Sequence, residues 1–281
     1  MMSVREIDME RFRDQIRLLI LKQLHHLGFG HYGGSLSIAD VLAVLYGKVM
    51  KIDPANPSWE DRDFLILSKG HGGPALYAAL HLAGYFEEDV LYTLNRNGTA
   101  LPSHPDRNLT PGVDMTTGSL GQGISAAAGV ALSHKLSGRT NRTFVIVGDG
   151  ELNEGQCWEA IQFAAHHKLH NLYVFVDDNK QQLDGPTKDI IDPLDFVSKF
   201  SAFGFYSERV NGHEPDAIYQ AVKRGEAQRE RPVAVILDTV KGKGIPYFEN
   251  MENSHHIRAN DEQNRIIEKI IMTLEEKEVR A

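Results

Sequence analysis

The stretch Thr143-Phe144-Val145-Ile146-Val147-Gly148-Asp149-Gly150 decides how this chain of 281 residues is interpreted. Its apolar run predicts a buried strand, and the Gly-Asp-Gly that follows breaks the strand sharply into a helix. Such a turn exposes backbone N–H groups at a helix N-terminus, where a phosphate or diphosphate can bind. The Asp149 carboxylate would repel that anion, and the conflict disappears if a divalent cation lies between them. Taken alone, Gly-Asp-Gly is explained equally well by an ordinary β-turn.

A second apolar run, Leu172-Tyr173-Val174-Phe175-Val176, ends in Asp177-Asp178-Asn179. One helix between the two runs would make them adjacent parallel strands, with Asp149 and Asn179 at the C-terminal ends, where such sheets bind ligands. The unit therefore predicts a metal–diphosphate site. A nucleotide P-loop is excluded because neither Gly-Lys pair precedes Ser or Thr, and the Gly148–Gly155 glycines are wrongly spaced for a Rossmann fingerprint.

Apolar periodicity along the chain predicts alternating strands and helices, and hence a mostly parallel sheet with helices on both faces. We expect helices over 7–27, 37–50, 74–83, 88–96, 121–137, 151–168, 194–203, 215–230 and 259–279, and strands over 64–67, 143–147, 172–176, 205–210 and 233–237. Ser37-Ile38-Ala39-Asp40 is expected to be a capping box that begins the second helix. The long loop 98–118 is expected to be functional. No repeat or linker is found, so 1–281 is interpreted as one domain.

Composition favours a cytoplasmic α/β protein. The net charge of −8, from 38 acidic and 30 basic residues, disfavours nucleic acid or an anionic membrane as partner. The charged start Met1 to Asp8 does not resemble a signal peptide, and no apolar run reaches the ~18 residues of a membrane span. The single cysteine, Cys157, excludes an intrachain disulfide and is interpreted as a core residue in preference to a nucleophile.

Four further segments accompany these two strands, and they are Gly30-His31-Tyr32-Gly33, Leu67-Ser68-Lys69-Gly70-His71, Pro102-Ser103-His104-Pro105 and Thr116-Thr117-Gly118-Ser119-Leu120-Gly121-Gln122-Gly123. In this order they resemble the N-terminal half of transketolase, a thiamine diphosphate enzyme. A full transketolase chain is more than twice as long, and its second half carries the pyrimidine-binding domain and the glutamate that activates the cofactor. The chain therefore resembles the A subunit of a split transketolase, which implies a pyrimidine-domain (B) partner, an α2β2 assembly and no activity alone.

The resemblance implies a site for thiamine diphosphate whose Mg²⁺, or alternatively Ca²⁺, is held by Asp149, Asn179 and the main-chain carbonyl of Gln181. The cofactor-binding residues that it implies are His71, Gly118, Ser119, Leu120, Gly121, Gly150, Glu151 and Asn179. Ser119 stands where the family usually has proline. Glu154 and Glu159 are expected to meet their counterparts at a dimer interface, although acids stabilised by a helix dipole are the simpler alternative.

Four histidines are candidate catalytic residues. His31 and His104 resemble the transketolase histidines that hydrogen-bond the sugar hydroxyls. A further histidine of this kind is expected after the last strand, and His256 is slightly favoured over His255, although the family's neighbouring Trp and Gly-Lys are absent. A neutral imidazole suits this work because it can donate or accept a hydrogen bond. Outside the resemblance, each would be interpreted as an ordinary loop histidine.

The implied reaction moves a two-carbon ketol unit from a ketose phosphate to an aldose, with the thiazolium as electron sink. The α subunit of a 2-oxoacid dehydrogenase shares the Gly-Asp-Gly…Asn site, but it has no reason to carry the loop histidines. A regulatory or structural partner that keeps the fold without catalysis is a third interpretation. The sugar is not identified, because the residues that select it lie largely in the family's second half.

Overall fold

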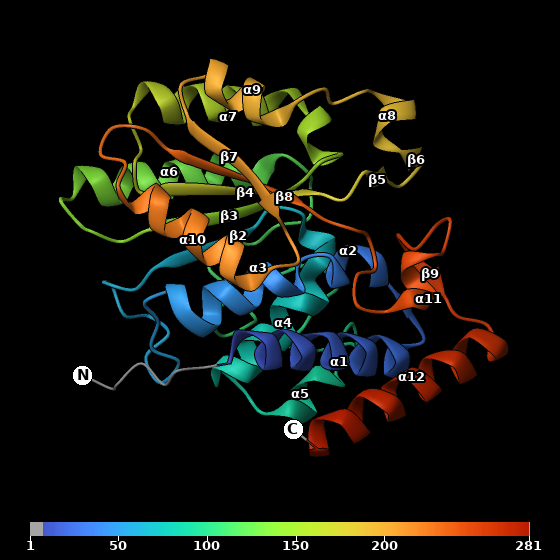
Figure 1. Ribbon diagram of the computed structural model, residues 1–281. Coiled ribbons are helices and arrows are strands. Elements are labelled where there is room, and N and C mark those ends of the chain that lie inside the picture. Colours follow the sequence, from blue (N-terminus) through green and yellow to red (C-terminus); the bar gives the residue numbers. More distant parts are fainter. Residues whose placement is uncertain (1–7, 281) are drawn as a thin grey trace.

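A five-stranded parallel sheet forms the centre of the computed structural model, which describes residues 8–280. Its strand order is β2-β3-β4-β8-β7, and every neighbouring pair is parallel (Figure 1). The strands are β2 (Phe64–Leu67), β3 (Thr143–Gly148), β4 (Leu172–Asp178), β7 (Tyr206–Asn211) and β8 (Val233–Asp238). The structure confirms the expected α/β class; the assignment of 1–281 to one domain stays a prediction.

Alternate side chains of each central strand enter two hydrophobic cores. In β3, Phe144 and Ile146 belong to the core on one face, while Val145 and Val147 belong to the core on the other. All six residues of β3 and all seven of β4 are buried. A parallel strand covered on both faces needs an unbroken apolar sequence, which explains the two runs seen in the sequence.

Helices cover both faces of the sheet (Figure 1). One face carries α6 (Gln122–Leu136), α7 (Gly155–His166) and α9 (Phe196–Ala202). The other carries α1 (Met9–Leu27), α3 (Ala39–Val44), α4 (Gly73–Ala83) and α10 (Pro215–Glu226), with α12 (Asp261–Arg280) packed along α1. Within residues 8–280, no helix is long and apolar enough to cross a bilayer.

Short elements fill the connections. They are β1 (Phe29–Gly30) paired with β9 (Ile257–Arg258), α2 (Tyr32–Leu36), a π-helical turn (Leu45–Val49), a 3₁₀ turn (Gly70–Gly72), α5 (Glu88–Leu91), β5 (Gln181–Gln182) paired with β6 (Gly185–Pro186), α8 (Thr187–Ile190) and α11 (Pro246–Glu249). The β1–β9 pair brings the strand that precedes His31 beside the end of the chain's last loop. Residues 1–7, where the first helix and the charged start were expected to begin, lie outside the described residues.

Four expected helix boundaries are wrong, and one of them is the end of the helix expected over 215–230, since α10 ends at Glu226. The capping box at Ser37 does not form, because Ser37 Oγ donates instead to Asp177 Oδ2 at 2.7 Å and α3 begins without a side-chain cap. The helix expected from residue 151 begins at Gly155, since a 3₁₀ turn (Glu151–Asn153) and an extended Glu154 come first. The helix expected over 88–96 is shorter, because α5 ends at Leu91 and the chain then turns, with Asn95 at φ 58°.

Candidate active site

The C-terminal edge of β3 and β4 gathers the predicted metal ligands. Gly148 pairs with Asp177, which places Asp149 beside the end of β4, as the sequence predicts. Asp149 accepts hydrogen bonds from the N–H of Gly150 at 2.8 Å and of Lys180 at 2.7 Å, so its carboxylate is held across the two strand ends. Its side chain is almost completely buried.

Asp149 lacks a basic partner in the described part of the chain, where no Lys, Arg or His side chain forms an ion pair with it. Burial and the nearby negative charge of Asp177 raise the pKa of Asp149 to about 7. A buried carboxylate without a compensating cation is unfavourable. The orphaned charge therefore fits a metal ligand.

Asn179 and Gln181 supply the other expected oxygens. Asn179 Nδ2 donates to Asp177 Oδ2 at 2.8 Å, which turns its Oδ1 away from that carboxylate, where it accepts from the Gln181 N–H at 3.1 Å. One carboxylate, one amide and one carbonyl oxygen form a donor set suited to Mg²⁺ or Ca²⁺ completed by phosphates and water. No cluster of three or more His, Cys, Asp or Glu side chains in residues 8–280 offers an alternative metal site.

Asp177 is the hub of the strand ends. Its fully buried carboxylate accepts hydrogen bonds from Lys69 Nζ at 2.6 Å, Ser37 Oγ at 2.7 Å, Asn179 Nδ2 at 2.8 Å and Thr239 Oγ1 at 2.6 Å. Burial acts to raise the pKa of Asp177, but Lys69 and these donors lower it overall. Sequence reasoning missed this role, although the Asp-Asp-Asn run and the Ser-Lys-Gly-His segment are visible in the sequence.

Glu151 ties the Gly-Asp-Gly turn to two other segments. Its buried carboxylate accepts from Ser68 Oγ at 2.5 Å, from the Gly121 N–H at 2.9 Å and from the Gly148 N–H at 3.0 Å. Because both oxygens are used within the protein, the Glu151 side chain supports the turn; binding of the cofactor by this residue stays a prediction. Gly150 lets the turn lie close to the Gln182 side chain, since a Cβ at this position would lie 2.8 Å from Gln182 Cβ.

The expected 118–121 segment passes directly over the start of the 3₁₀ turn at Gly70. A Cβ on Gly70 would lie 2.9 Å from the Gly118 N atom, so only glycine permits the approach. Gly118 and Gly121 have φ of 155° and 83°, in the region that favours glycine. Ser119 is exposed and Leu120 is partly exposed, so both are accessible to a ligand or partner.

The other four candidate loop histidines converge on His31. Its ring centroid lies 5.4 Å from that of His71, 6.1 Å from His104, 5.3 Å from His255 and 4.7 Å from His256. His71 and His255 also approach each other, at 5.0 Å. These residues come from four loops separated by up to 225 positions of the sequence, so ordinary surface placement does not explain them.

Burial lowers the pKa of four of these histidines, which keeps them neutral near pH 7. Burial, followed by the other histidines, lowers the pKa of His31 to about 3, and burial with Lys241 lowers that of His255 to about 4. Burial also lowers the pKa of His104 and, more strongly, that of His71. Neutral imidazoles can each donate one hydrogen bond and accept another, which suits the recognition of sugar hydroxyls.

His255 and His256 both reach the cluster, and the structure does not choose between them. Lys241 Nζ lies 3.2 Å from His255 Nδ1; an ammonium can only donate, so Nδ1 accepts and Nε2 carries the proton. His256 is more exposed, and its ring lies 5.9 Å from that of Phe29. Lys241 is a further site residue that sequence reasoning missed.

Glycines dock the loop that carries these two histidines. The Gly33 N–H donates to the Ser254 carbonyl at 2.9 Å, and the Gly242 N–H donates to the Gly33 carbonyl at 3.1 Å. A Cβ on Gly33 would lie 2.4 Å from Ser254 Oγ, and one on Gly34 would lie 3.2 Å from the His71 ring. The glycines that follow His31 therefore allow it to lie against His71 and against the loop that carries His255 and His256.

Glu154 and Glu159 lie apart from this cluster, on the surface of α7 and the turn before it. Their exposure is compatible with an interface, and their pairing across a dimer stays a prediction. Cys157 is fully buried, and burial raises its pKa to about 12, which agrees with a core residue.

Comparison with known proteins identifies the family. Residues 9–276 match the family model described as "Transketolase, thiamine diphosphate binding domain". The chain belongs to the transketolase family. It is 49% identical over 263 residues to the 6-deoxy-6-sulfo-D-fructose transketolase subunit SqwG of Clostridium sp. (strain MSTE9), covering 93% of this chain and 95% of that relative. It is 40% identical over 244 residues to the A subunit of the apulose-4-phosphate transketolase of Actinobacillus succinogenes, covering 86% and 87% of the two chains.

Solved transketolases have the same fold. The transketolase of Leishmania mexicana superposes with a TM-score of 0.85 at 29% identity, over 98% of this chain and 46% of that one. The chain therefore spans about half the length of that enzyme, while it spans nearly all of the two relatives named as subunits. Membership in a thiamine diphosphate-binding transketolase family confirms the resemblance and supports thiamine diphosphate as the cofactor.

Proposed function

We propose that this chain is the diphosphate-binding (A) subunit of a two-chain transketolase, with Mg²⁺ as the metal and a pyrimidine-domain chain as partner. The observation that carries the proposal is the histidine cluster around His31, which Lys241 links to the expected metal ligands through its contacts with His255 and the Gln181 carbonyl. A diphosphate–metal site and a hydroxyl-recognition site would thus lie close together, as a ketol-transferring enzyme requires.

Asp149, Asn179 and the Gln181 carbonyl would hold the metal, and Gly150 would let the diphosphate approach the backbone. When bound, the thiazolium supplies the electron sink for cleaving and forming a carbon–carbon bond. His31, His104 and one of His255 and His256 would orient the sugar hydroxyls. We assign His71 to the diphosphate side of the cluster. Its ring lies 5.4 Å from that of His31 and packs closely against Gly34.

The tautomer of His255 determines which of its ring nitrogens can donate to a ligand. Its Nε2 bears the proton because Lys241 donates to Nδ1, so His255 presents a donor on its free side. A neutral donor of this kind can hydrogen-bond a substrate hydroxyl or carbonyl oxygen without adding charge. The remaining imidazoles retain a free acceptor or donor, since no ring nitrogen of His31, His71 or His104 has a side-chain hydrogen bond among the described contacts.

A partner chain is supported by the relatives, two of which are described as transketolase subunits of similar length. In the family, the domain that binds the aminopyrimidine lies in the second half, so the cofactor would be completed between two chains. We propose an α2β2 assembly in which Glu154 and Glu159 contribute to the contact between two copies of this chain. The sugar substrate would be a ketose phosphate or a related acidic ketose, in line with the substrates in the relatives' names.

The α subunit of a 2-oxoacid dehydrogenase is the rival enzyme, since it would share the metal site. A small 2-oxoacid has no hydroxyl array, so it gives no reason for five converging imidazoles. A non-catalytic partner is disfavoured by the same cluster, because a chain without catalysis gives no reason for five imidazoles from four loops to converge.

The proposal is tested by reconstituting the two chains. Co-purify the partner that associates with this chain, then assay ketol transfer from a panel of ketose phosphates, 6-deoxy-6-sulfo-D-fructose among them, with thiamine diphosphate and Mg²⁺. We expect turnover only with both chains present. His31→Ala and His104→Ala should then reduce turnover and leave cofactor affinity nearly unchanged, with the exposed His166→Ala as the control. Turnover by this chain alone, with partner excluded by mass spectrometry, would contradict the two-chain assignment.

A further inference from the structure

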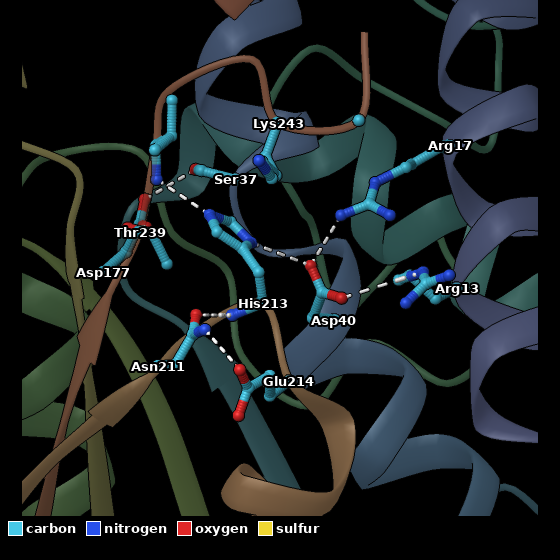
Figure 2. A network of polar contacts seen from close by, with 12 residues as sticks. Arg13, Arg17, Ser37, Asp40, Asp177, Asn211, His213, Glu214, Thr239 and Lys243 are labelled. Carbon is cyan, nitrogen blue, oxygen red and sulfur yellow. Dashed lines mark hydrogen bonds and ion pairs between the residues drawn. The ribbon is translucent and has the colours of Figure 1, made fainter.

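His213 joins helix α3 to the loop that follows β8, although it lies outside the histidine cluster. It is found in the turn between β7 and α10, and its side chain is only 11% exposed. Its Nδ1 lies 3.0 Å from Asp40 Oδ2, and its Nε2 accepts the Val240 N–H at 2.8 Å (Figure 2). The proposed reaction uses neither contact directly, so the placement of this imidazole needs an explanation.

The two contacts fix the position of the ring proton of His213. A backbone N–H can only donate, so Nε2 is unprotonated and Nδ1 carries the proton that it donates to Asp40. Asp40 is fully buried, and its charge is compensated by Arg17 at 2.6 Å and Arg13 at 3.8 Å, both from α1. A carboxylate held in this way orients the imidazole that donates to it. The acceptor nitrogen of His213 is therefore directed at Val240.

The turn that carries His213 lies directly against the end of β8. The Gly212 N–H donates to the Asp238 carbonyl at 2.9 Å, and a Cβ on Gly212 would lie 2.4 Å from Thr239 Cγ2. The Asn211 side chain holds the turn itself, because its Oδ1 accepts the His213 N–H at 3.0 Å (Figure 2). The imidazole thus meets the loop from a fixed position.

The loop depends on bonds to its backbone between Thr239 and Gly242. Thr239 Oγ1 donates to Asp177 Oδ1 at 2.6 Å, and the Gly242 N–H donates to the Gly33 carbonyl at 3.1 Å. Val240 lies between these two points, and its own side chain is 42% exposed. The hydrogen bond from its N–H to the imidazole therefore restrains a part of the loop that side-chain packing does not.

Val240 directly precedes the residue that reaches the histidine cluster. Lys241 Nζ lies 3.2 Å from His255 Nδ1, and this contact sets the tautomer of His255. The stem of Lys241 packs against Gly33, where a Cβ would lie 2.9 Å from Lys241 Cγ. The amide that His213 holds is therefore one residue away from the side chain that orients His255.

We propose that His213 is a positioning residue for the sugar site. Oriented by Asp40, it holds the Val240 amide and thereby keeps the Lys241 ammonium against Nδ1 of His255. Nε2–H of His255 is then free to donate to a hydroxyl or carbonyl oxygen of the sugar. This inference rests on the proposed function, in which His255 is one of the candidates for binding the sugar.

Two substitutions separate the contacts of His213. The amide oxygen of His213→Gln can take the place of Nε2, so this variant keeps the acceptor for the Val240 N–H and loses the donor to Asp40. The amide nitrogen of His213→Asn can take the place of Nδ1, so this variant keeps the donor and loses the acceptor. Each variant loses one hydrogen bond, so both should melt below the wild type by similar amounts.

Turnover is measured with this chain assembled with its partner, at saturating thiamine diphosphate and Mg²⁺, using a ketose phosphate that the wild type accepts. We expect kcat/KM of His213→Asn to fall about 10-fold, less than the ~100-fold that a misplacement of about 1 Å can cost. His213→Gln should stay within about threefold of the wild type. Arg13→Gln is the control from the same network, since Arg13 pairs with Asp14 and Asp40, and it should change kcat/KM by less than about twofold.

The ring nitrogens of His255 give a readout that does not depend on turnover. In ¹H–¹⁵N spectra of the unliganded chain, the wild type and His213→Gln should show an unprotonated Nδ1 and a protonated Nε2 at His255. In His213→Asn the two ¹⁵N shifts should move toward each other, because the tautomer is no longer fixed by Lys241.

Equal losses of kcat/KM in the two His213 variants, in step with their melting temperatures, would overturn the inference and make His213 a purely structural residue. Wild-type turnover together with wild-type His255 shifts in His213→Asn would overturn it as well, and so would failure of either variant to fold. A wild-type assembly without ketol transfer from any ketose phosphate would contradict the proposed function itself. The His255 spectra would still show whether His213 positions the loop.

Discussion

Replacement of Asp177 by asparagine tests the hub of the strand ends. The amide keeps the shape of the side chain and can still accept hydrogen bonds, but the substitution removes the negative charge beside Lys69 Nζ, 2.6 Å away. Both side chains are buried, at 1% exposure or less. The variant therefore leaves an uncompensated ammonium in the core, and breaking such a buried pair costs about 3–5 kcal/mol.

Urea denaturation followed by circular dichroism measures the loss as a change in the free energy of unfolding. At roughly 2–4 °C per kcal/mol for a domain of this size, the melting temperature should fall by roughly 6–20 °C. Asp238→Asn is the control, because the Asp238 side chain is 57% exposed and pairs with an exposed Lys180. Its effect should stay within about 0.5 kcal/mol.

The double variant Asp177→Asn with Lys69→Met sharpens the test. Removing the ammonium as well should restore part of the stability lost in Asp177→Asn, because no unpaired charge then remains. A loss below about 1 kcal/mol in the single variant, or a double variant less stable than Asp177→Asn alone, would refute the reasoning.

Two other predictions concern the histidine cluster and the loop that completes it. The ¹H–¹⁵N spectra of the unliganded chain should show His31 and His255 neutral from about pH 5 to 8, since burial lowers their pKa to about 3 and about 4. Below about pH 6.5 the unfolded chain binds more protons at these two histidines than the folded chain does. They therefore make stability fall as the pH is lowered from about 6.5 to about 4, and a titration midpoint near 6.5 would refute this. Gly33→Ala should lower the melting temperature and the affinity for thiamine diphosphate, because its Cβ would lie 2.4 Å from Ser254 Oγ. Gly129→Ala, on an open helix surface, should be neutral or stabilising, and equal effects of the two would contradict the docking role of Gly33.

The sheet could be predicted from the sequence because strands buried on both faces leave unbroken apolar runs. Strands β3 and β4 followed from their runs, and the Gly-Asp-Gly and Asp-Asp-Asn that end them placed Asp149 beside Asn179. Helix starts were less predictable. Ser37 has the pattern of a cap, yet its hydroxyl donates to a buried carboxylate 140 positions away and the helix begins without a side-chain cap.

The polar network behind the site could not be predicted, because its members are brought together by long-range packing. Lys69 and Asp177 are 108 positions apart, and Lys241 meets Gln181 across 60. Pairs so far apart leave no local pattern in the sequence from which they could be predicted. The histidines were found through their resemblance to a family, while their mutual approach and their lowered pKa values follow from burial that only the fold defines.

The most direct test of the central claim is the Mg²⁺ dependence of thiamine diphosphate binding by this chain assembled with its partner, measured by isothermal titration with Mg²⁺ and with EDTA. If Asp149, Asn179 and Gln181 hold the metal that bridges the diphosphate, the wild type binds the cofactor only with Mg²⁺. Asp149→Asn should abolish measurable binding of the cofactor even with Mg²⁺, while the melting temperature of the unliganded variant stays that of the wild type. Binding that is equally tight in EDTA, or unchanged in Asp149→Asn, would contradict the account.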